Sequence, residues 1–189
     1  MRKHSMNLQH LKIDSSWTLF LDRDGVINRR IVDGYAKSWD QFEFLPGVHE
    51  ALKHFRQVFG TIVVVSNQQG VGKGLMTDLE VQGIHREMVR QIHNSGGGID
   101  AVFYSPYLHA ERSIMRKPNI GMALKARKQF PAIRFSQSLM VGDSLSDMVF
   151  GKRLRMTTVF ISPDALIARK HPWQINFLFP DLISLAHAL

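Results

Sequence analysis

Two carboxylates separated by one residue, Asp22 and Asp24, are the first candidates for chemistry in this sequence. They directly follow the apolar run 17–21, which has the length and composition of a buried parallel strand. Gly25 comes next and allows a sharp turn. Like charges this close repel unless a cation lies between them, and open α/β sheets bind ligands at the carboxyl ends of their strands. The pattern indicates a site for phosphate or a hard metal ion, although a solvated loop could also contain two acids.

A second polar cluster follows the β-branched run 61–65, which we expect to form a buried strand. Ser66 and Asn67 stand at its end, and the glycine-rich segment 70–74 comes next. A hydroxyl and exposed backbone N–H groups at a strand end can bind phosphate oxygens. A flexible turn with a capping serine is the alternative, and the glycine spacing is not that of a dinucleotide-binding loop.

Two later clusters complete the candidates. Lys117 precedes a predicted helix that ends near Phe130, and the segment 142–147, Gly-Asp-Ser-Leu-Ser-Asp, follows an expected strand at 138–141. A fixed ammonium group is useful beside phosphate, although a surface salt bridge is the ordinary role of such a lysine. Asp147 could equally be an acid favoured by a helix dipole.

The elements that must position these residues alternate along the chain. We expect further strands at 99–105 and 157–161, and helices over 46–59, 78–94 and 180–189. Alternating strands and helices predict an α/β fold of three layers, with a Rossmann-like central parallel sheet flanked by helices.

Length and composition bound the remaining possibilities. At 189 residues the chain fits a single domain over 1–189, in which 1–15 is a polar lead-in and 29–45 a flap near the site. The aromatic residues of that flap could equally be packing residues. The absence of cysteine excludes disulfides and thiolate metal sites and is compatible with a reducing cytoplasm.

The charge and the start of the chain suggest partners and location. The net charge of +8 favours anionic partners, but the basic residues are scattered, so nucleic acid is the less favoured partner. No apolar segment of signal or membrane-spanning length follows the basic start, so we expect a cytoplasmic protein without membrane association.

The four clusters, in this order, resemble the motifs of the haloacid dehalogenase-like superfamily of phosphatases, and the similarity covers residues 17–162. A closer resemblance is to the family of D-glycero-D-manno-heptose 1,7-bisphosphate 7-phosphatases, with the histidinol-phosphate phosphatases as near relatives. It rests on the segments 21–28, 33–35, 42–48, 66–71 and 116–118. The resemblance implies a haloacid dehalogenase-like fold. Because no large insertion is evident between the expected strands, we also expect a minimal cap.

The chain departs from that family at its zinc loop. Where the family has Cys-x-His near the end of the third strand and Cys-x-Cys before Arg-Lys-Pro, this chain has Ser105, Tyr107, Ser113 and Met115. We therefore expect no structural zinc and a loop held by packing. Ser144 also stands where the family often has a lysine, a difference that bears on the substrate more than on the chemistry.

The resemblance implies a catalytic role for each aspartate. Asp22 would attack phosphorus and form an aspartyl-phosphate, and Asp24 would protonate the leaving group and then activate water. Mg²⁺ would be held by Asp22, the backbone carbonyl of Asp24, and Asp143. Asp147 would support the site from behind the metal ligands.

The resemblance also implies how phosphate and substrate would be bound. Ser66 and the backbone N–H of Asn67 would bind phosphoryl oxygens, while Lys117 would neutralise developing charge and orient the nucleophile. Arg116, and more weakly Lys73, would contact the other phosphate or hydroxyl groups of the substrate.

The expected protein is thus a monomeric, Mg²⁺-dependent phosphatase acting on a small phosphorylated sugar, with D-glycero-D-manno-heptose 1,7-bisphosphate first. Two alternatives keep the chemistry and change the substrate to histidinol phosphate or the 3′-phosphate of a nucleic acid. An alternative from another class is a catalytically silent phosphosugar-binding module. It is disfavoured because both aspartates, the lysine and the metal-binding aspartate are all present.

Overall fold

A computed structural model describes residues 8–31 and 34–189, so Asp33 of the family resemblance and the first part of the predicted lead-in lie outside the described residues. The strands are β1 (Thr18–Leu21), β2 (Thr61–Asn67), β3 (Ala101–Ser105), β4 (Ser138–Gly142), β5 (Thr157–Ile161) and β6 (Phe177–Phe179). The α-helices are α1 (Val48–Val58), α2 (Asp78–Asn94), α3 (Gly121–Gln129), α4 (Leu145–Arg153), α5 (Leu166–Lys170) and α6 (Leu182–His187). Short 3₁₀ helices are η1 (Leu8–Leu11), η2 (Trp39–Gln41), η3 (His109–Glu111) and η4 (Phe135–Gln137).

The strands form one six-stranded parallel sheet in the order β3-β2-β1-β4-β5-β6, which confirms the predicted α/β class. The chain leaves β1 toward β2 on one side and later returns to place β4 on the other side. Such a reversal of strand order opens a crevice at the carboxyl ends of the strands. The sheet therefore provides a ligand-binding position where β1 and β4 end.

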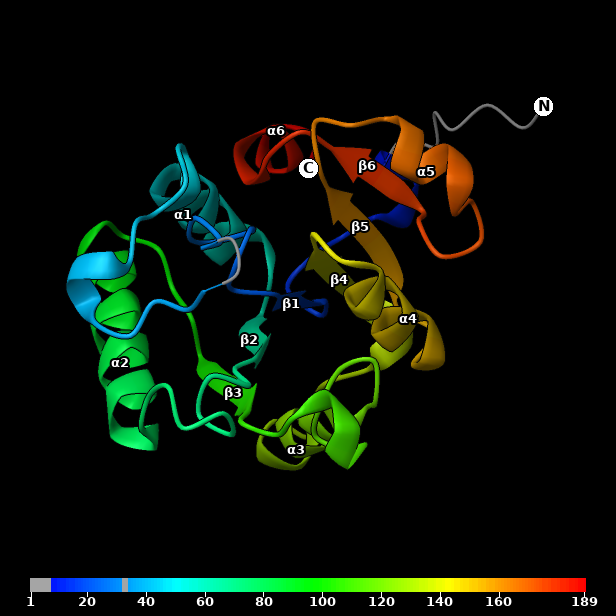
Figure 1. Cartoon of the computed structure of the whole chain (residues 1–189). Helices are drawn as coiled ribbons and strands as arrows, with labels where there is room; N and C mark the ends of the chain where they lie inside the picture. Colours follow the sequence, from blue (N-terminus) through cyan, green and yellow to red (C-terminus); the bar gives the residue numbers. More distant parts are fainter. Residues whose placement is uncertain (1–7, 32–33) are drawn as a thin grey trace.

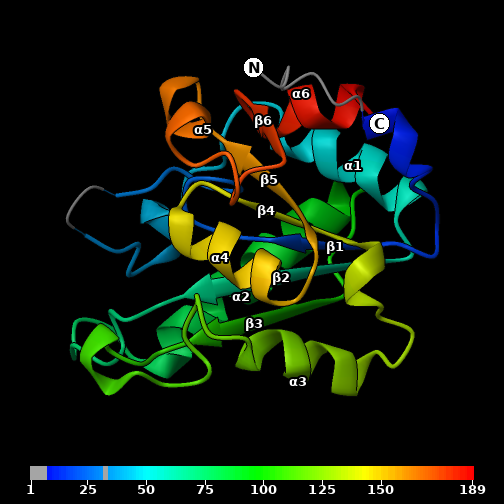
Figure 2. The ribbon, with the colours of Figure 1, turned by 90° about the vertical axis from the view of Figure 1, so that its right-hand side faces the viewer.

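Alternate residues of β1 face opposite layers, as expected for a strand buried on both sides. Leu19 and Leu21 pack with residues of α1, α2 and α6, while Phe20 packs with residues of α3 and α4. Figure 1 shows these helices on the two sides of the sheet, and Figure 2 shows α6 beside α1. Burying β1 between the two layers fixes the position of the residues that follow it.

Most predicted elements are present, and the differences are local. The third strand begins at Ala101 rather than at 99, and β2 continues through Ser66 and Asn67. The bounds of α4 were not predicted, although the helix-dipole alternative for Asp147 placed a helix start there, and the short helix α5 and the three-residue strand β6 were not predicted. Among the described residues, no helix is both long and apolar enough to cross a membrane.

The segment 29–45 joins β1 to α1 and has no large insertion, in agreement with the minimal cap. Its aromatic residues pack together: the ring centroids of Trp39 and Phe42 lie 4.8 Å apart, and those of Phe42 and Phe44 lie 5.0 Å apart. An isolated bridge also joins Phe44 to Asn28. These aromatics therefore anchor the segment, in line with the packing alternative.

Candidate active site

The predicted residues converge at the carboxyl end of the sheet. Asp22 directly follows β1, Asp143 directly follows β4, and Ser66 is the second-last residue of β2. Lys117, from the loop between β3 and α3, reaches the same place. Asp22, Ser66 and Lys117 line a cavity of about 300 Å³, large enough to hold part of a phosphorylated sugar.

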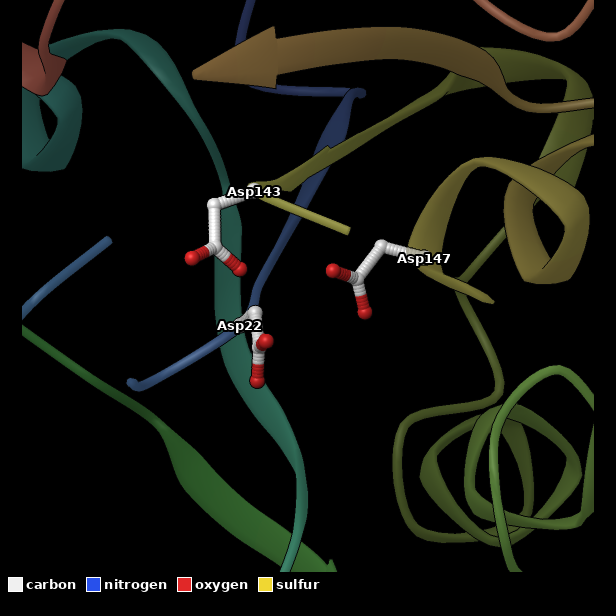
Figure 3. Close-up of side chains that lie close together, drawn as sticks. All are labelled: Asp22, Asp143 and Asp147. Atoms are coloured by element: carbon white, nitrogen blue, oxygen red, sulfur yellow. The ribbon is translucent and has the colours of Figure 1, made fainter. Parts of the chain in front are cut away.

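Three carboxylates lie close together beside this cavity (Figure 3). Asp22, Asp143 and Asp147 each place an oxygen so that these oxygens lie within 4.8 Å of one another. Asp147 comes from the first turn of α4, where it also caps the helix by accepting hydrogen bonds from the backbone and hydroxyl of Ser144 (3.1 and 2.6 Å). The helix α4 is therefore what brings the third acid to the site.

A buried ammonium group links two of these acids. The Nζ of Lys117 lies 2.9 Å from Asp22 Oδ1 and 2.6 Å from Asp147 Oδ1, and it donates to the carbonyl of Val65 (2.6 Å). Burial alone would lower the pKa of Lys117, but the charges of Asp147 and Asp22 outweigh it and raise that pKa. The lysine is thus a permanent cation beside the predicted nucleophile.

One lysine does not balance three acids. Burial, together with the charges of Asp147 and Asp143, raises the pKa of Asp22 to about 7 despite the opposing effect of Lys117. Burial likewise raises the pKa of Asp143 to about 6, although Arg30 opposes the shift. The protein alone therefore leaves the cluster short of positive charge.

The cluster fits a hard divalent cation. Its donors are all carboxylate oxygens, which Mg²⁺ prefers, and Asp22 and Asp143 come from neighbouring strands. Gly25, with φ of +86°, makes room for one of them, because a Cβ at that position would lie 1.9 Å from Asp143 Oδ2. The sharp turn predicted at Gly25 thus shapes the wall of the candidate metal site.

Asp24 is held by a separate network. Arg23 Nη2 donates to both of its carboxylate oxygens (2.9 Å each), Asn28 Nδ2 donates to Oδ1 (3.0 Å) and Gln68 Nε2 donates to Oδ2 (2.6 Å). Burial would raise the pKa of Asp24, but the charge of Arg23 and these hydrogen bonds lower it overall. Asp22 and Asp24 therefore lie in opposite electrostatic environments although one residue separates them.

The network extends into the core. Arg23 is buried, and its Nη1 lies 3.1 Å from Nε2 of His85 in α2. Burial and the charge of Arg23 lower the pKa of His85 to about 3, so the imidazole is neutral and its Nε2 accepts from the guanidinium. His85 is thus a buried partner of Arg23, and sequence reasoning identified no role for Arg23 or Gln68.

Ser66 and Asn67 hold neighbouring parts of the site. Ser66 is buried and its Oγ accepts a hydrogen bond from Gln68 Nε2 (2.8 Å). The side chain of Asn67 accepts from the backbone N–H of Lys117 (3.0 Å) and donates to its carbonyl (3.1 Å). Asn67 therefore fixes the backbone from which Lys117 reaches the acids.

The two predicted substrate-binding cations occupy different positions. Arg116 lines the cavity and donates from Nη1 to the carbonyl of Tyr107 (3.2 Å), while its Nε is buried without a partner among the described residues. Lys73 lies over the ring of Tyr35, 5.5 Å from the centroid, and is not among the residues that line the cavity. Arg116 is the better placed of the two for a substrate.

The residues at the zinc-ligand positions of the family lie in or beside the loop 105–115. This loop is tied by hydrogen bonds to the segment that carries Arg116, since Arg116 bonds Tyr107 and Asn119 Nδ2 donates to the carbonyl of Ser113 (2.9 Å). The expectation of packing was incomplete, because polar contacts to the backbone also hold this loop.

Comparisons with known proteins agree with this geometry. The sequence model of the family described as polynucleotide kinase 3 phosphatase matches residues 19–181. The chain is 47% identical over 132 residues to the D-glycero-alpha-D-manno-heptose-1,7-bisphosphate 7-phosphatase of Mycobacterium bovis, with 70% of each chain covered. It is 35% identical over 175 residues to the D-glycero-beta-D-manno-heptose-1,7-bisphosphate 7-phosphatase of Escherichia coli K12, with 85% of this chain and 88% of that one covered.

A solved structure extends the comparison to the fold. The D,D-heptose 1,7-bisphosphate phosphatase of B. bronchiseptica, complexed with magnesium and phosphate, superposes with a TM-score of 0.81 at 27% identity, covering 90% of this chain and 96% of that one. Fold and site thus define a phosphatase of the haloacid dehalogenase-like superfamily. The chain belongs to the family described as polynucleotide kinase 3 phosphatase and, within it, to the heptose-1,7-bisphosphate 7-phosphatases.

Proposed function

We propose that this protein is a Mg²⁺-dependent phosphatase that removes the 7-phosphate of D-glycero-D-manno-heptose 1,7-bisphosphate, acting as a single cytoplasmic domain and as a monomer. The observation that carries the proposal is the position of Asp22. It lies at the end of the central strand, between the buried Lys117 and the carboxylate of Asp143. Relatives that are 47% and 35% identical to this chain are named heptose-1,7-bisphosphate 7-phosphatases, which supports the proposal.

The nucleophile in this proposal is Asp22. Its carboxylate attacks phosphorus, the ester bond to the sugar oxygen breaks, and an aspartyl-phosphate forms, which divides one difficult displacement into two easier ones. Lys117 holds Asp22 Oδ1 in place and neutralises charge beside it. Asp22, Asp143 and the backbone carbonyl of Asp24, with Asp147 in support, would hold Mg²⁺, and the ion would supply further positive charge beside the anionic ester.

Asp24 supplies and removes the protons. Its lowered pKa favours the deprotonated carboxylate, and both of its oxygens accept hydrogen bonds, which suits the second half-reaction, in which a base activates water. To protonate the departing sugar oxygen in the first half-reaction, Asp24 must first take up a proton from solvent and exchange one hydrogen-bond partner for the substrate; the proton that it later removes from water restores the acid form. Gln68 is suited to release it, because the same amide nitrogen also has Ser66 Oγ as an acceptor.

Phosphate and sugar are bound by the surrounding residues. Ser66 and the backbone N–H of Asn67 bind oxygens of the transferred phosphoryl group. Arg116 binds the second phosphate or a hydroxyl of the sugar, since its Nε lacks a partner among the described residues and its side chain lines the cavity. Lys73 contributes through Tyr35, which lines the cavity and carries the ammonium group over its ring.

The test is a comparison of substrates with Mg²⁺ present. Phosphate release should be measured from the α and β anomers of the heptose 1,7-bisphosphate, from histidinol phosphate and from a 3′-phosphorylated oligonucleotide. We expect one heptose anomer to have the highest kcat/KM. A higher value for histidinol phosphate or for the oligonucleotide would overturn the substrate, and a steep salt dependence would support nucleic acid. Phosphate binding without turnover of any of them would indicate a silent binding module.

A further inference from the structure

Arg30 makes a contact for which the proposed reaction has no use. Its Nη2 donates to Asp143 Oδ1 at 2.7 Å and to the backbone carbonyl of Asp24 at 3.3 Å. These oxygens belong to two of the three groups proposed to hold Mg²⁺. A single guanidinium nitrogen therefore already bridges two prospective metal ligands.

The position of Arg30 suits a cation that can be exchanged. Its side chain is 49% exposed and comes from the segment 29–45 outside the sheet, whereas the side chain of Asp143 is only 17% exposed. An exposed arginine can leave an ion pair at little cost, because water solvates the freed guanidinium. Arg30 also lines the cavity, so its guanidinium has open space beside it.

The contact between Arg30 and Asp143 reduces the repulsion among the neighbouring acids. Asp22, Asp143 and Asp147 are close together; Lys117 pairs with Asp22 and Asp147, whereas Asp143 pairs with Arg30. Without a metal ion and without Arg30, Asp143 would face the other acids with no cation beside it. Partial neutralisation by Arg30 keeps its carboxylate in the orientation that a metal requires.

We infer that Arg30 takes the place of the divalent cation in the metal-free protein. It holds Asp143 and the Asp24 carbonyl in position, and the metal ion must displace it in order to bind. The inference rests on the proposed function, because it takes Asp143 and the Asp24 carbonyl as metal ligands. Its consequence is that Arg30 weakens Mg²⁺ binding while keeping the site arranged to receive the ion.

The chain offers a matched control in the neighbouring residue. Arg29 carries the same charge on the same segment, but its guanidinium pairs with Glu43, with Nε and Nη2 at 2.8 and 2.9 Å from the carboxylate oxygens. Arg29→Met removes one positive charge without opening the metal site. Arg30→Met removes one positive charge and the contact with Asp143.

The experiment is calorimetric titration of the full-length, metal-free protein with MgCl₂, with no substrate present. We expect the Kd for Mg²⁺ to fall roughly 3- to 10-fold in Arg30→Met, as for loss of a competing, partly exposed ion pair, and to change less than about twofold in Arg29→Met. Equal Kd values in the two variants would mean that only the loss of one positive charge changes Mg²⁺ binding. Weaker Mg²⁺ binding in Arg30→Met would mean that Arg30 favours metal binding. Either result overturns the inference.

The side-chain ¹H–¹⁵N NMR signals of the arginines provide a second readout that does not depend on a variant. The Arg30 signals should shift on addition of Mg²⁺ while those of Arg29 stay in place, and unshifted Arg30 signals at saturating Mg²⁺ would contradict displacement. These measurements use no phosphate ester. A protein that binds Mg²⁺ as expected but fails to hydrolyse the heptose would refute the proposed function and leave this inference standing.

Discussion

The two walls of the active site each pair a cation with an acid, but they do so in opposite surroundings. On the inner wall, the side chain of Lys117 is 1% exposed and contacts Asp22, Asp147 and the carbonyl of Val65. On the outer wall, the half-exposed Arg30 contacts Asp143 and one carbonyl. A buried cation with three oxygen partners cannot leave without stranding charge, whereas a solvated one can. The difference separates a permanent cation from an exchangeable one.

The largest effect on stability and activity should come from removing Lys117, the cation of the inner wall. Lys117→Met leaves Asp22 and Asp147 facing each other without their cation, so we expect the free energy of unfolding to fall by about 3–5 kcal/mol at pH 8. Phosphate release should fall at least about 10³-fold. Urea denaturation and a phosphate assay measure these losses, with the exposed Lys128→Met on α3 as the control. A free energy of unfolding equal to that of the control would show that the ion pairs of Lys117 are not needed for stability.

The second prediction concerns pH and the metal-free protein. The pKa of Asp22 is raised to about 7 from an ordinary value of 3.8, chiefly by burial, so the folded chain holds this proton more tightly than the unfolded chain. The stability contributed by the proton is fully present below pH 3.8 and is lost as the pH rises through about 7. Asp22→Asn should therefore be more stable than wild type at pH 8, by roughly 2 kcal/mol, with the gap closing toward pH 4.

Denaturation in EDTA across that pH range measures the gap. A difference between Asp22→Asn and wild type that stays constant from pH 4 to 8 would contradict the raised pKa.

The third prediction concerns Arg116, the cation that we propose binds the substrate. Arg116→Ala should raise KM for the heptose bisphosphate about tenfold or more and change kcat less, because Arg116 lines the cavity and donates to the carbonyl of Tyr107 rather than to a reacting carboxylate. Steady-state kinetics provide both constants, with Lys73→Ala as the comparison, for which a smaller change is expected. An unchanged KM in Arg116→Ala would remove it from the substrate site.

The smallest effect on stability should come from removing Arg30, the cation of the outer wall. Arg30→Met should change the free energy of unfolding by less than about 1 kcal/mol, since a half-exposed ion pair contributes little to stability. Thermal denaturation of the metal-free protein checks this value. A loss as large as that of Lys117→Met would mean that the two walls have the same role.

The sequence permitted prediction of the fold and of the main acids because their signals are local. An apolar run that stops at Asp22, and a second that stops before Asp143, are each visible in a few consecutive residues. The extent of the helix α4 was not predicted because its buried face is short and includes Asp147; only its start was considered, as the helix-dipole alternative for Asp147. The strand β6 has three residues and depends on β5 for its hydrogen bonds.

The supporting network of the site could not be predicted from the sequence. Arg23 and Gln68 stood inside recognised motifs, but their contacts join the loop after β1, the end of β2 and the helix α2, which meet only in the folded chain. The same applies to Arg30, whose partner Asp143 is 113 residues away. Such residues have no distinctive type or spacing, because their role is set by the tertiary structure.

The central claim is that Asp22 is the nucleophile of a cation-supported phosphatase. The most direct measurement is phosphate release from the heptose 1,7-bisphosphate by Asp22→Asn with saturating Mg²⁺, using protein shown by denaturation to be folded. We predict no release above the rate of the uncatalysed reaction, while wild-type protein turns over and loses its activity in EDTA. Turnover by Asp22→Asn within about tenfold of wild type would contradict the account.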